Sequence, residues 1–185
     1  DLKEEFFASN YDTSAFDTLP VPSVWQMHGY DLNHYINSRY PFPADPPYVP
    51  QDNPCGAYIH KFQYTKDHAA PKAFLHNPVG SYVREFDLDE GLKGKNVCIS
   101  FQGVEQAFYV WLNGKYVGYS QVSHSTSEFD VTEHLLEGEN TLAVLVLKWC
   151  DGSYLECQDK FRWNGIFRDV YLLRRPDAML WDYFV

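Results

Sequence analysis

The chain has 185 residues and a mass of 21.5 kDa, the size of one ordinary domain with a sizeable core. Its 25 acidic and 15 basic side chains give a formal charge of −10, which argues against nucleic acids and anionic membrane surfaces as partners. The apolar fraction of 45% excludes a disordered chain, and no apolar run approaches the roughly 20 residues of a membrane span.

Aromatic side chains are unusually frequent, with 5 Trp, 14 Tyr and 13 Phe. Aromatic residues favour half-buried strands, and they also stack on the apolar faces of ligands such as sugar rings. Composition alone therefore leaves two interpretations open: an aromatic-rich β core and a surface that binds sugars.

The first 54 residues differ in character from the rest. Residues 1–24 read as an incomplete start that leads into a turn-rich Leu-Pro-Val-Pro-Ser segment. Residues 24–54 are rich in Pro and Tyr, and proline both removes a backbone donor and fixes φ. This composition predicts an ordered, extended arm over 24–54 that packs on its surroundings, rather than a helix or a central strand.

From residue 57 onward the chain carries short β-rich runs separated by Gly, Asn or Asp turns. The run Leu142–Leu147 is apolar on both faces, which is typical of a strand at the centre of a sandwich. Many short strands with punctuating turns predict an all-β fold, a jelly-roll β-sandwich. The runs predicted to be strands are Ala57–Tyr64, Tyr82–Leu88, Val97–Phe101, Ala107–Leu112, Tyr116–Ser120, Thr141–Trp149, Val170–Leu173 and Leu180–Val185.

Two local signals specify how some of these runs are joined. Asn113-Gly114 lies between two runs and predicts a type I′ hairpin turn. One short helical turn is expected at Thr132–Leu136, with Asp130 or Thr132 as its N-cap.

One ten-residue segment occurs twice. Asn53-Pro-Cys-Gly-Ala-Tyr-Ile-His-Lys-Phe62 recurs 24 residues later as Asn77-Pro-Val-Gly-Ser-Tyr-Val-Arg-Glu-Phe86, with five of ten positions identical. Two copies are too few for a solenoid, so we interpret them as one duplicated turn and strand. Because the second copy leads directly into Val97–Phe101, we expect it to pair in the main sheet.

Motifs of metal and nucleophilic chemistry are missing from the sequence. The seven histidines lack ligand spacing, and there is no P-loop, no G-x-G-x-x-G and no G-x-S-x-G. The cysteines lack a C-x-x-C pair, which favours buried free thiols, although a Cys150–Cys157 disulfide stays open. The four cysteines are Cys55, Cys98, Cys150 and Cys157.

The segment Asp151–Val170 mixes charge with aromatic side chains directly after the most apolar strand. Acidic and basic residues alternate there beside Phe161, Trp163 and Phe167. The pattern favours buried ion pairs, and the polar rim of a ligand site stays open as the alternative.

Several longer motifs occur in collinear order along nearly the whole chain. They include Trp25-Gln-Met-His-Gly-Tyr30, Tyr35-Ile-Asn-Ser-Arg-Tyr-Pro41, Pro46-Pro-Tyr-Val-Pro50, Phe101-Gln-Gly-Val104, Val110-Trp-Leu-Asn-Gly114, Val117-Gly-Tyr-Ser120, Ser127-Glu-Phe-Asp130 and the segment Asp151–Val170. Together these motifs resemble the opening domain of the large β-galactosidases of glycoside hydrolase family two.

The resemblance implies a galactose-binding-domain-like jelly roll, often called the sugar-binding domain, ahead of two immunoglobulin-like domains and a catalytic barrel. It also implies a retaining glycosidase whose catalytic glutamates both lie in the barrel. No stretch of this sequence matches the barrel motifs. We therefore expect residues 1–185 to be a single domain of a much larger enzyme, with no catalytic residue of its own.

The resemblance further implies two residues of a sugar site. By matching motif, Asn37 resembles the asparagine that reaches the galactose pocket, and Asp159 resembles the aspartate that contacts the sugar and a sodium ion. Sodium and magnesium are expected in the parent enzyme and no cofactor in this chain alone. The sequence departs from the family at Cys157, where an aspartate is usual, and in carrying two Asn-Pro-x-Gly-x-Tyr strands.

The expected partners are a β-galactoside in the parent enzyme and the remaining domains of the same polypeptide. The parent is expected to be a homo-oligomer. Its expected compartment is the cytoplasm or the periplasm. Two alternatives come from other classes. The chain could be a stand-alone carbohydrate-binding module that holds glycans on its aromatic residues. It could also be a purely structural domain that mediates assembly.

Overall fold

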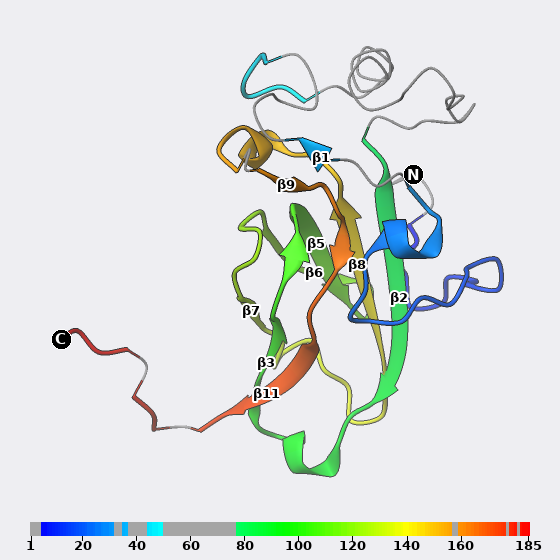
Figure 1. The fold of residues 1–185 in the computed structure, drawn as a ribbon. Helices are drawn as coiled ribbons and strands as arrows, with labels where there is room; N and C mark the ends of the chain where they lie inside the picture. The colour runs from blue at the N-terminus through cyan, green and yellow to red at the C-terminus, as the bar shows by residue number, and fades with distance from the viewer. Residues whose placement is uncertain are drawn as a thin grey trace.

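The computed structural model describes residues 5–31, 35–36, 44–49, 77–156, 159–176, 178–180 and 182–185 (Figure 1). The described residues form strands and short 3₁₀ helices and contain no α-helix. The elements in chain order are η2 (Trp25–His28), β1 (Tyr35–Ile36), β2 (Val79–Asp87), η3 (Glu90–Leu92), β3 (Asn96–Phe101), β4 (Val104–Glu105), β5 (Ala107–Leu112), β6 (Lys115–Ser120), β7 (Ser127–Asp130), β8 (Glu139–Leu147), η4 (Asp151–Tyr154), β9 (Lys160–Phe161), β10 (Gly165–Ile166) and β11 (Val170–Arg175).

Two antiparallel sheets pack face to face. One sheet has the order β2-β8-β5-β6 and the other β11-β3-β7, and two short ribbons, β1·β9 and β10·β4, lie beside them. The core joins the inward side chains of β3 to those of β5 and β8. This arrangement confirms the all-β jelly-roll sandwich, and it confirms strands at the second repeat copy and over 97–101, 107–112, 116–120, 141–147 and 170–173.

Strand β8 lies inside the four-stranded sheet, between β2 and β5. Its side chains alternate between two apolar environments: Val144 and Val146 face the main core, while Ala143 and Leu145 face a second apolar cluster. All four are at most 2% exposed. Strand β8 therefore buries apolar side chains on both of its faces, as its sequence predicts, and burial on each face stabilises it.

The second cluster covers the outer face of this sheet with residues from the start of the chain. Phe6 is 3% exposed and meets Trp111 of β5 edge to face, with ring centroids 5.7 Å apart. The Phe7 ring stacks on the same indole at 4.9 Å. Phe6 and Phe7 thus act as an apolar strap on the sandwich.

The turn between β5 and β6 is the predicted two-residue hairpin. Leu112 pairs with Lys115, and Asn113 and Gly114 both have positive φ, as a type I′ turn requires. The Asn113 amide also donates to the His134 carbonyl at 2.8 Å, which ties the hairpin to the loop before β8.

The second copy of the repeat forms the edge strand β2, which pairs with β8 along its whole length. Asn77 exchanges two hydrogen bonds with the Trp149 backbone, and the Trp25 indole N–H donates to the Tyr82 hydroxyl at 2.6 Å. A Cβ on Gly80 would lie 2.4 Å from the Trp25 ring, so only glycine lets the indole approach. The expected pairing of this copy is confirmed. The first copy, Asn53–Phe62, lies outside the described residues.

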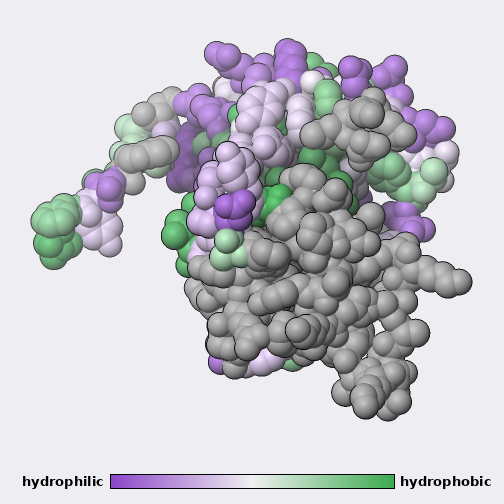
Figure 2. Space-filling view, turned by 90° about the horizontal axis from the view of Figure 1, so that it is seen from above, coloured by the Kyte–Doolittle hydropathy of each residue, from purple (hydrophilic) through white to green (hydrophobic). Residues whose placement is uncertain are grey.

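Other expectations are wrong in detail. The described residues of Leu180–Val185 form no strand and are strongly exposed, and Figure 2 shows this end of the chain standing away from the body. Within Thr132–Leu136 the single turn expected is present over residues 132–134, with the His134 and Leu135 N–H groups donating to the Val131 carbonyl, but it is not assigned as a helix. Asp130 accepts the Thr132 N–H as a cap would. No helix among the residues that the structure describes is long and apolar enough to cross a membrane.

Candidate functional site

The ribbon of β1 and β9 positions the candidate site. Tyr35 pairs with Phe161 and Ile36 with Lys160 in antiparallel register. Because side chains of a strand alternate between its two faces, Asp159 and Phe161 share one face, and Lys160 lies on the other. The two faces have opposite characters.

The outer face of the ribbon carries a carboxylate among aromatic rings. Asp159 is exposed, and its Oδ1 accepts a hydrogen bond from the Tyr35 hydroxyl. The rings of Tyr35 and Phe161 lie 5.6 Å apart, and Phe161 stacks on Trp163 at 5.5 Å with an interplanar angle of 11°. These three rings are 39–48% exposed. We call Tyr35, Asp159, Phe161 and Trp163 the aromatic face.

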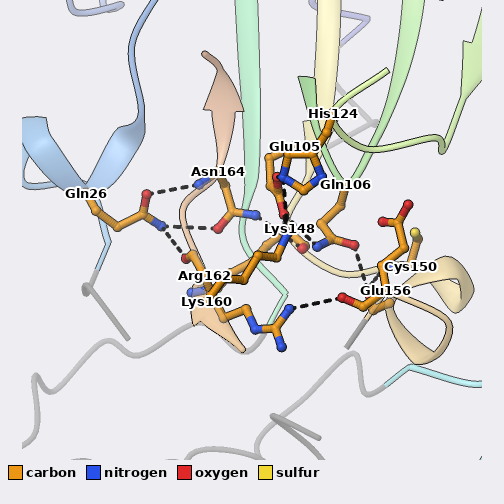
Figure 3. A network of polar contacts seen from close by, with 11 residues as sticks. Gln26, Glu105, Gln106, His124, Lys148, Cys150, Glu156, Lys160, Arg162 and Asn164 are labelled. Carbon is orange, nitrogen blue, oxygen red and sulfur yellow. Dashed lines mark hydrogen bonds and ion pairs between the residues drawn. The ribbon is translucent and has the colours of Figure 1, made fainter. Parts of the chain in front are cut away.

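The inner face is fixed by an ionic cluster around a buried carboxylate (Figure 3). Glu105 is 5% exposed, and its Oε1 lies 2.6 Å from Lys160 Nζ. The same oxygen accepts the Gln106 amide at 3.0 Å, and Oε2 lies 2.7 Å from His124 Nε2. His124 Nε2 also lies 3.2 Å from Lys160 Nζ, so the imidazole contacts both members of the Glu105–Lys160 pair. Glu105 therefore joins β4, β9 and the loop after β6.

A second polar cluster ties the arm to the same region. The Gln26 side chain donates to Asn164 Oδ1 at 3.1 Å and accepts the Asn164 backbone N–H at 3.0 Å. Gln26 also donates to Asp31, which forms an ion pair with Lys148. Lys148 is fully buried, and this burial lowers the pKa of its ammonium group although Asp31 opposes the shift. Residues 25–31 are thereby held against the end of β8.

The described cysteines are free thiols. Cys150 is buried, as expected, and burial raises the pKa of its thiol. Cys98 is only half-buried. Because Cys150 is free, the Cys150–Cys157 disulfide that the sequence left open is not formed. Cys55 and Cys157 lie outside the described residues.

The described part of the chain contains no group of three or more His, Cys, Asp or Glu side chains that could hold a metal ion. Asp159 supplies carboxylate oxygens, which suit a hard cation such as sodium. One carboxylate does not complete a coordination shell, so any ion at this position needs further ligands from elsewhere.

The predicted site residues have different outcomes. Asp159 is at the surface as expected, while Asn37 lies outside the described residues. Arg168, a basic residue of the charged segment Asp151–Val170, donates from its guanidinium to the Gln102 and His124 carbonyls and lies over the Phe167 ring.

Three residues that contact one another or Asp159 at the candidate site were not predicted from the sequence: Tyr35, Glu105 and Lys160. A signal for Glu105 was present, since a charged residue within the apolar stretch that spans β4 and β5 requires a buried partner. Tyr35 lies two residues before Asn37, the strand spacing of side chains that share a face.

Comparison with known families decides the classification. The family model described as glycosyl hydrolases family 2, sugar binding domain matches residues 1–76 and 62–176. The chain belongs to this family. The first matched range contains the first copy of the repeated strand, and the second range contains the second copy.

Relatives of the family 2 chain include proteins named β-galactosidase. A β-galactosidase of Actinobacillus pleuropneumoniae is 47% identical over 95% of this chain, and one of Staphylococcus xylosus is 43% identical over 98%. The chain spans only 15% and 16% of the lengths of these two relatives.

Solved structures share the fold of the family 2 domain. A β-glycosidase from Bacteroides vulgatus covers 94% of this chain with a TM-score of 0.58 and 25% identity. A Bacteroides uniformis β-glucuronidase covers 92% with a TM-score of 0.62 and 22% identity. The chain spans 18% and 16% of these two structures.

Proposed function

We propose that this chain is the non-catalytic N-terminal domain of a β-galactosidase and that it contributes side chains to the galactose pocket. The observation that carries the proposal is Asp159, an exposed carboxylate that already binds a hydroxyl group, that of Tyr35. The same geometry suits a sugar hydroxyl, and aromatic rings such as Phe161 suit the apolar face of a sugar. Relatives named β-galactosidase at 43–47% identity support the substrate class.

Asn37 is the second side chain of the proposed pocket. It follows Ile36 in the sequence, and Asp159 precedes Lys160, which is the register partner of Ile36. Continuing the antiparallel register by one residue would bring positions 37 and 159 opposite each other, on the side of Tyr35. An amide there offers both a donor and an acceptor to sugar hydroxyls.

Other parts of the proposal concern the parent enzyme. Residues 1–185 form one domain in which the arm 24–54 brings Asn37 to the pocket, and the remaining domains supply both catalytic carboxylates, about 5 Å apart in a retaining enzyme. When sodium is bound, Asp159 would be one of its oxygen ligands and the missing domains would supply the others. Magnesium and a homo-oligomeric state are proposed for the parent alone.

The test of the proposed function is Asp159→Asn in the full-length polypeptide. We expect kcat/KM for a β-galactoside to fall by about 100-fold or more, because an amide loses the charge-assisted bond to the sugar. Asn37→Ala should be less harmful, and both variants should unfold at the temperature of the parent. Unchanged kcat/KM in Asp159→Asn would refute the proposal. The isolated 185-residue chain should not hydrolyse the substrate.

The stacked, exposed pair of Phe161 and Trp163 also favours a second candidate function, a stand-alone carbohydrate-binding module. Calorimetric titration of the isolated chain with galactosides separates the two. The enzyme-domain proposal expects negligible affinity, since the other half of the pocket is missing. Binding that is lost in Phe161→Ala would favour the module.

A further inference from the structure

We propose that Glu105 is a positioning residue for Asp159: by holding Lys160 on the inner face of β9, it keeps the Asp159 carboxylate available on the aromatic face. The inference rests on the proposed function, because it assumes that Asp159 faces the sugar. Glu105 is remote in sequence from Asp159 and belongs to a different ribbon, β4·β10.

The need for such a residue follows from the sequence of β9. Lys160 is the direct neighbour of Asp159, so its long flexible side chain could pair with that carboxylate instead of pointing inward. The 2.6 Å contact with Glu105 gives the ammonium a stronger alternative, because that pair is largely shielded from water. Side-chain exposure is 19% for Lys160 and 7% for Glu105. Asp159 is thus left to the Tyr35 hydroxyl.

Glu105 can hold Lys160 in one place because Glu105 is itself immobilised. Its backbone pairs with Gly165 of β10, and its carboxylate accepts the Gln106 amide and faces His124. Gln106 is 1% exposed and accepts the Ser153 hydroxyl at 3.0 Å. The chain of bonds from η4 to β9 fixes the position of the carboxylate, which is the property a positioning residue requires.

The experiment compares three variants of the full-length polypeptide: Glu105→Gln, Glu105→Gln with Lys160→Met, and Glu105→Gln with Asp159→Asn. Glu105→Gln keeps the size and shape of the side chain but removes its negative charge, so Lys160 is free to pair with Asp159. We expect kcat/KM for a β-galactoside to fall by about tenfold.

Lys160→Met on top of Glu105→Gln should restore kcat/KM to within about twofold of the parent, since no ammonium remains to occupy Asp159. This double variant also leaves no unpaired buried charge, so it folds even where the single variant does not. A purely structural role for the ion pair predicts the opposite, a double variant no better than the single one, and that result would overturn the inference.

In the Asp159→Asn background, Glu105→Gln should cause no further loss of kcat/KM, because the effect of Glu105→Gln acts through the Asp159 carboxylate. The matched control is Glu128→Gln, which breaks the pair of Glu128 with Arg175 between β7 and β11 and should leave kcat/KM unchanged. If Asp159→Asn alone leaves kcat/KM unchanged, the proposed function fails. If Asp159→Asn lowers kcat/KM and Glu105→Gln leaves it unchanged, only the positioning role fails.

Discussion

Strands β8 and β9 show two ways in which this chain uses the alternation of side chains. Strand β8 is nine residues long and apolar on both faces, and it is held by packing between a main core and an apolar strap. Strand β9 is two residues long, with a buried ion pair on one face and an exposed carboxylate between rings on the other. The fold is encoded in long apolar runs, whereas the site is encoded in single polar residues that need partners from distant segments.

The same contrast resolves the segment Asp151–Val170, for which the sequence left two interpretations open. The structure shows an ion pair on one side, where Lys160 points inward to Glu105. On the other side Asp159, Phe161 and Trp163 form an exposed polar and aromatic surface, which we propose as the rim of the ligand site. A sequence pattern that fits two environments can belong to a strand that faces both.

The largest predicted difference between the two regions is in stability. Phe108→Ala on β5 removes a ring that is 2% exposed and packs between Phe101 and Phe129. It should lower the free energy of unfolding by about 3–5 kcal/mol. Phe161→Ala on the aromatic face, where the ring is 48% exposed, should cost less than about 1 kcal/mol. Urea unfolding of the 185-residue variants measures both, and equal losses would contradict the division of roles.

A smaller effect tests how the arm is held to the sheet. In Gly80→Ala the new Cβ would lie 2.4 Å from the Trp25 ring, so the indole must move. We expect a loss of about 1–3 kcal/mol in the free energy of unfolding. Gly138→Ala is the matched control, because a Cβ there has no atom within 4 Å. A loss in the control as large as in Gly80→Ala would show that the close approach of Trp25 is not the cause.

The smallest effect concerns the turn that follows β7. Two hydrogen bonds from Thr132 hold the pKa of Asp130 below its usual value. The ionised carboxylate therefore stabilises the fold above the unfolded pKa of about 3.8, and this contribution is lost as pH falls through the lower, folded value. Asp130→Ala should cost less than about 1 kcal/mol at pH 7.

The difference in unfolding free energy between Asp130→Ala and the parent chain should shrink as the pH falls below about 4. Unfolding curves recorded at pH 7 and at the lowest pH where both proteins fold would check this. A difference that does not depend on pH would assign the loss to packing rather than to charge.

The parts of the structure that sequence predicted are those governed by local rules. A continuous apolar run specified β8, and the positive φ needed at Asn113 and Gly114 specified the hairpin. The ribbons β1·β9 and β4·β10 were not predicted, because two-residue strands carry no periodic signal. Asp159 was found through family resemblance alone, and its contact with Tyr35 depends on residues 124 positions apart. Leu180–Val185 has strand-like composition, but its described residues have no neighbour to pair with.

In the proposed function, residues 37 and 159 line one pocket on the outer face of the β1·β9 ribbon. The most direct measurement is disulfide formation between Asn37→Cys and Asp159→Cys in a chain whose four native cysteines are replaced by serine. Side chains directly opposite in an antiparallel pair have Cβ atoms about 4.5–5.5 Å apart, close enough for cross-linking under mild oxidation. The account predicts a cross-link between these two cysteines and none between Asn37→Cys and Lys160→Cys, which faces inward. Failure of the first pair, or equal cross-linking of both, would contradict it.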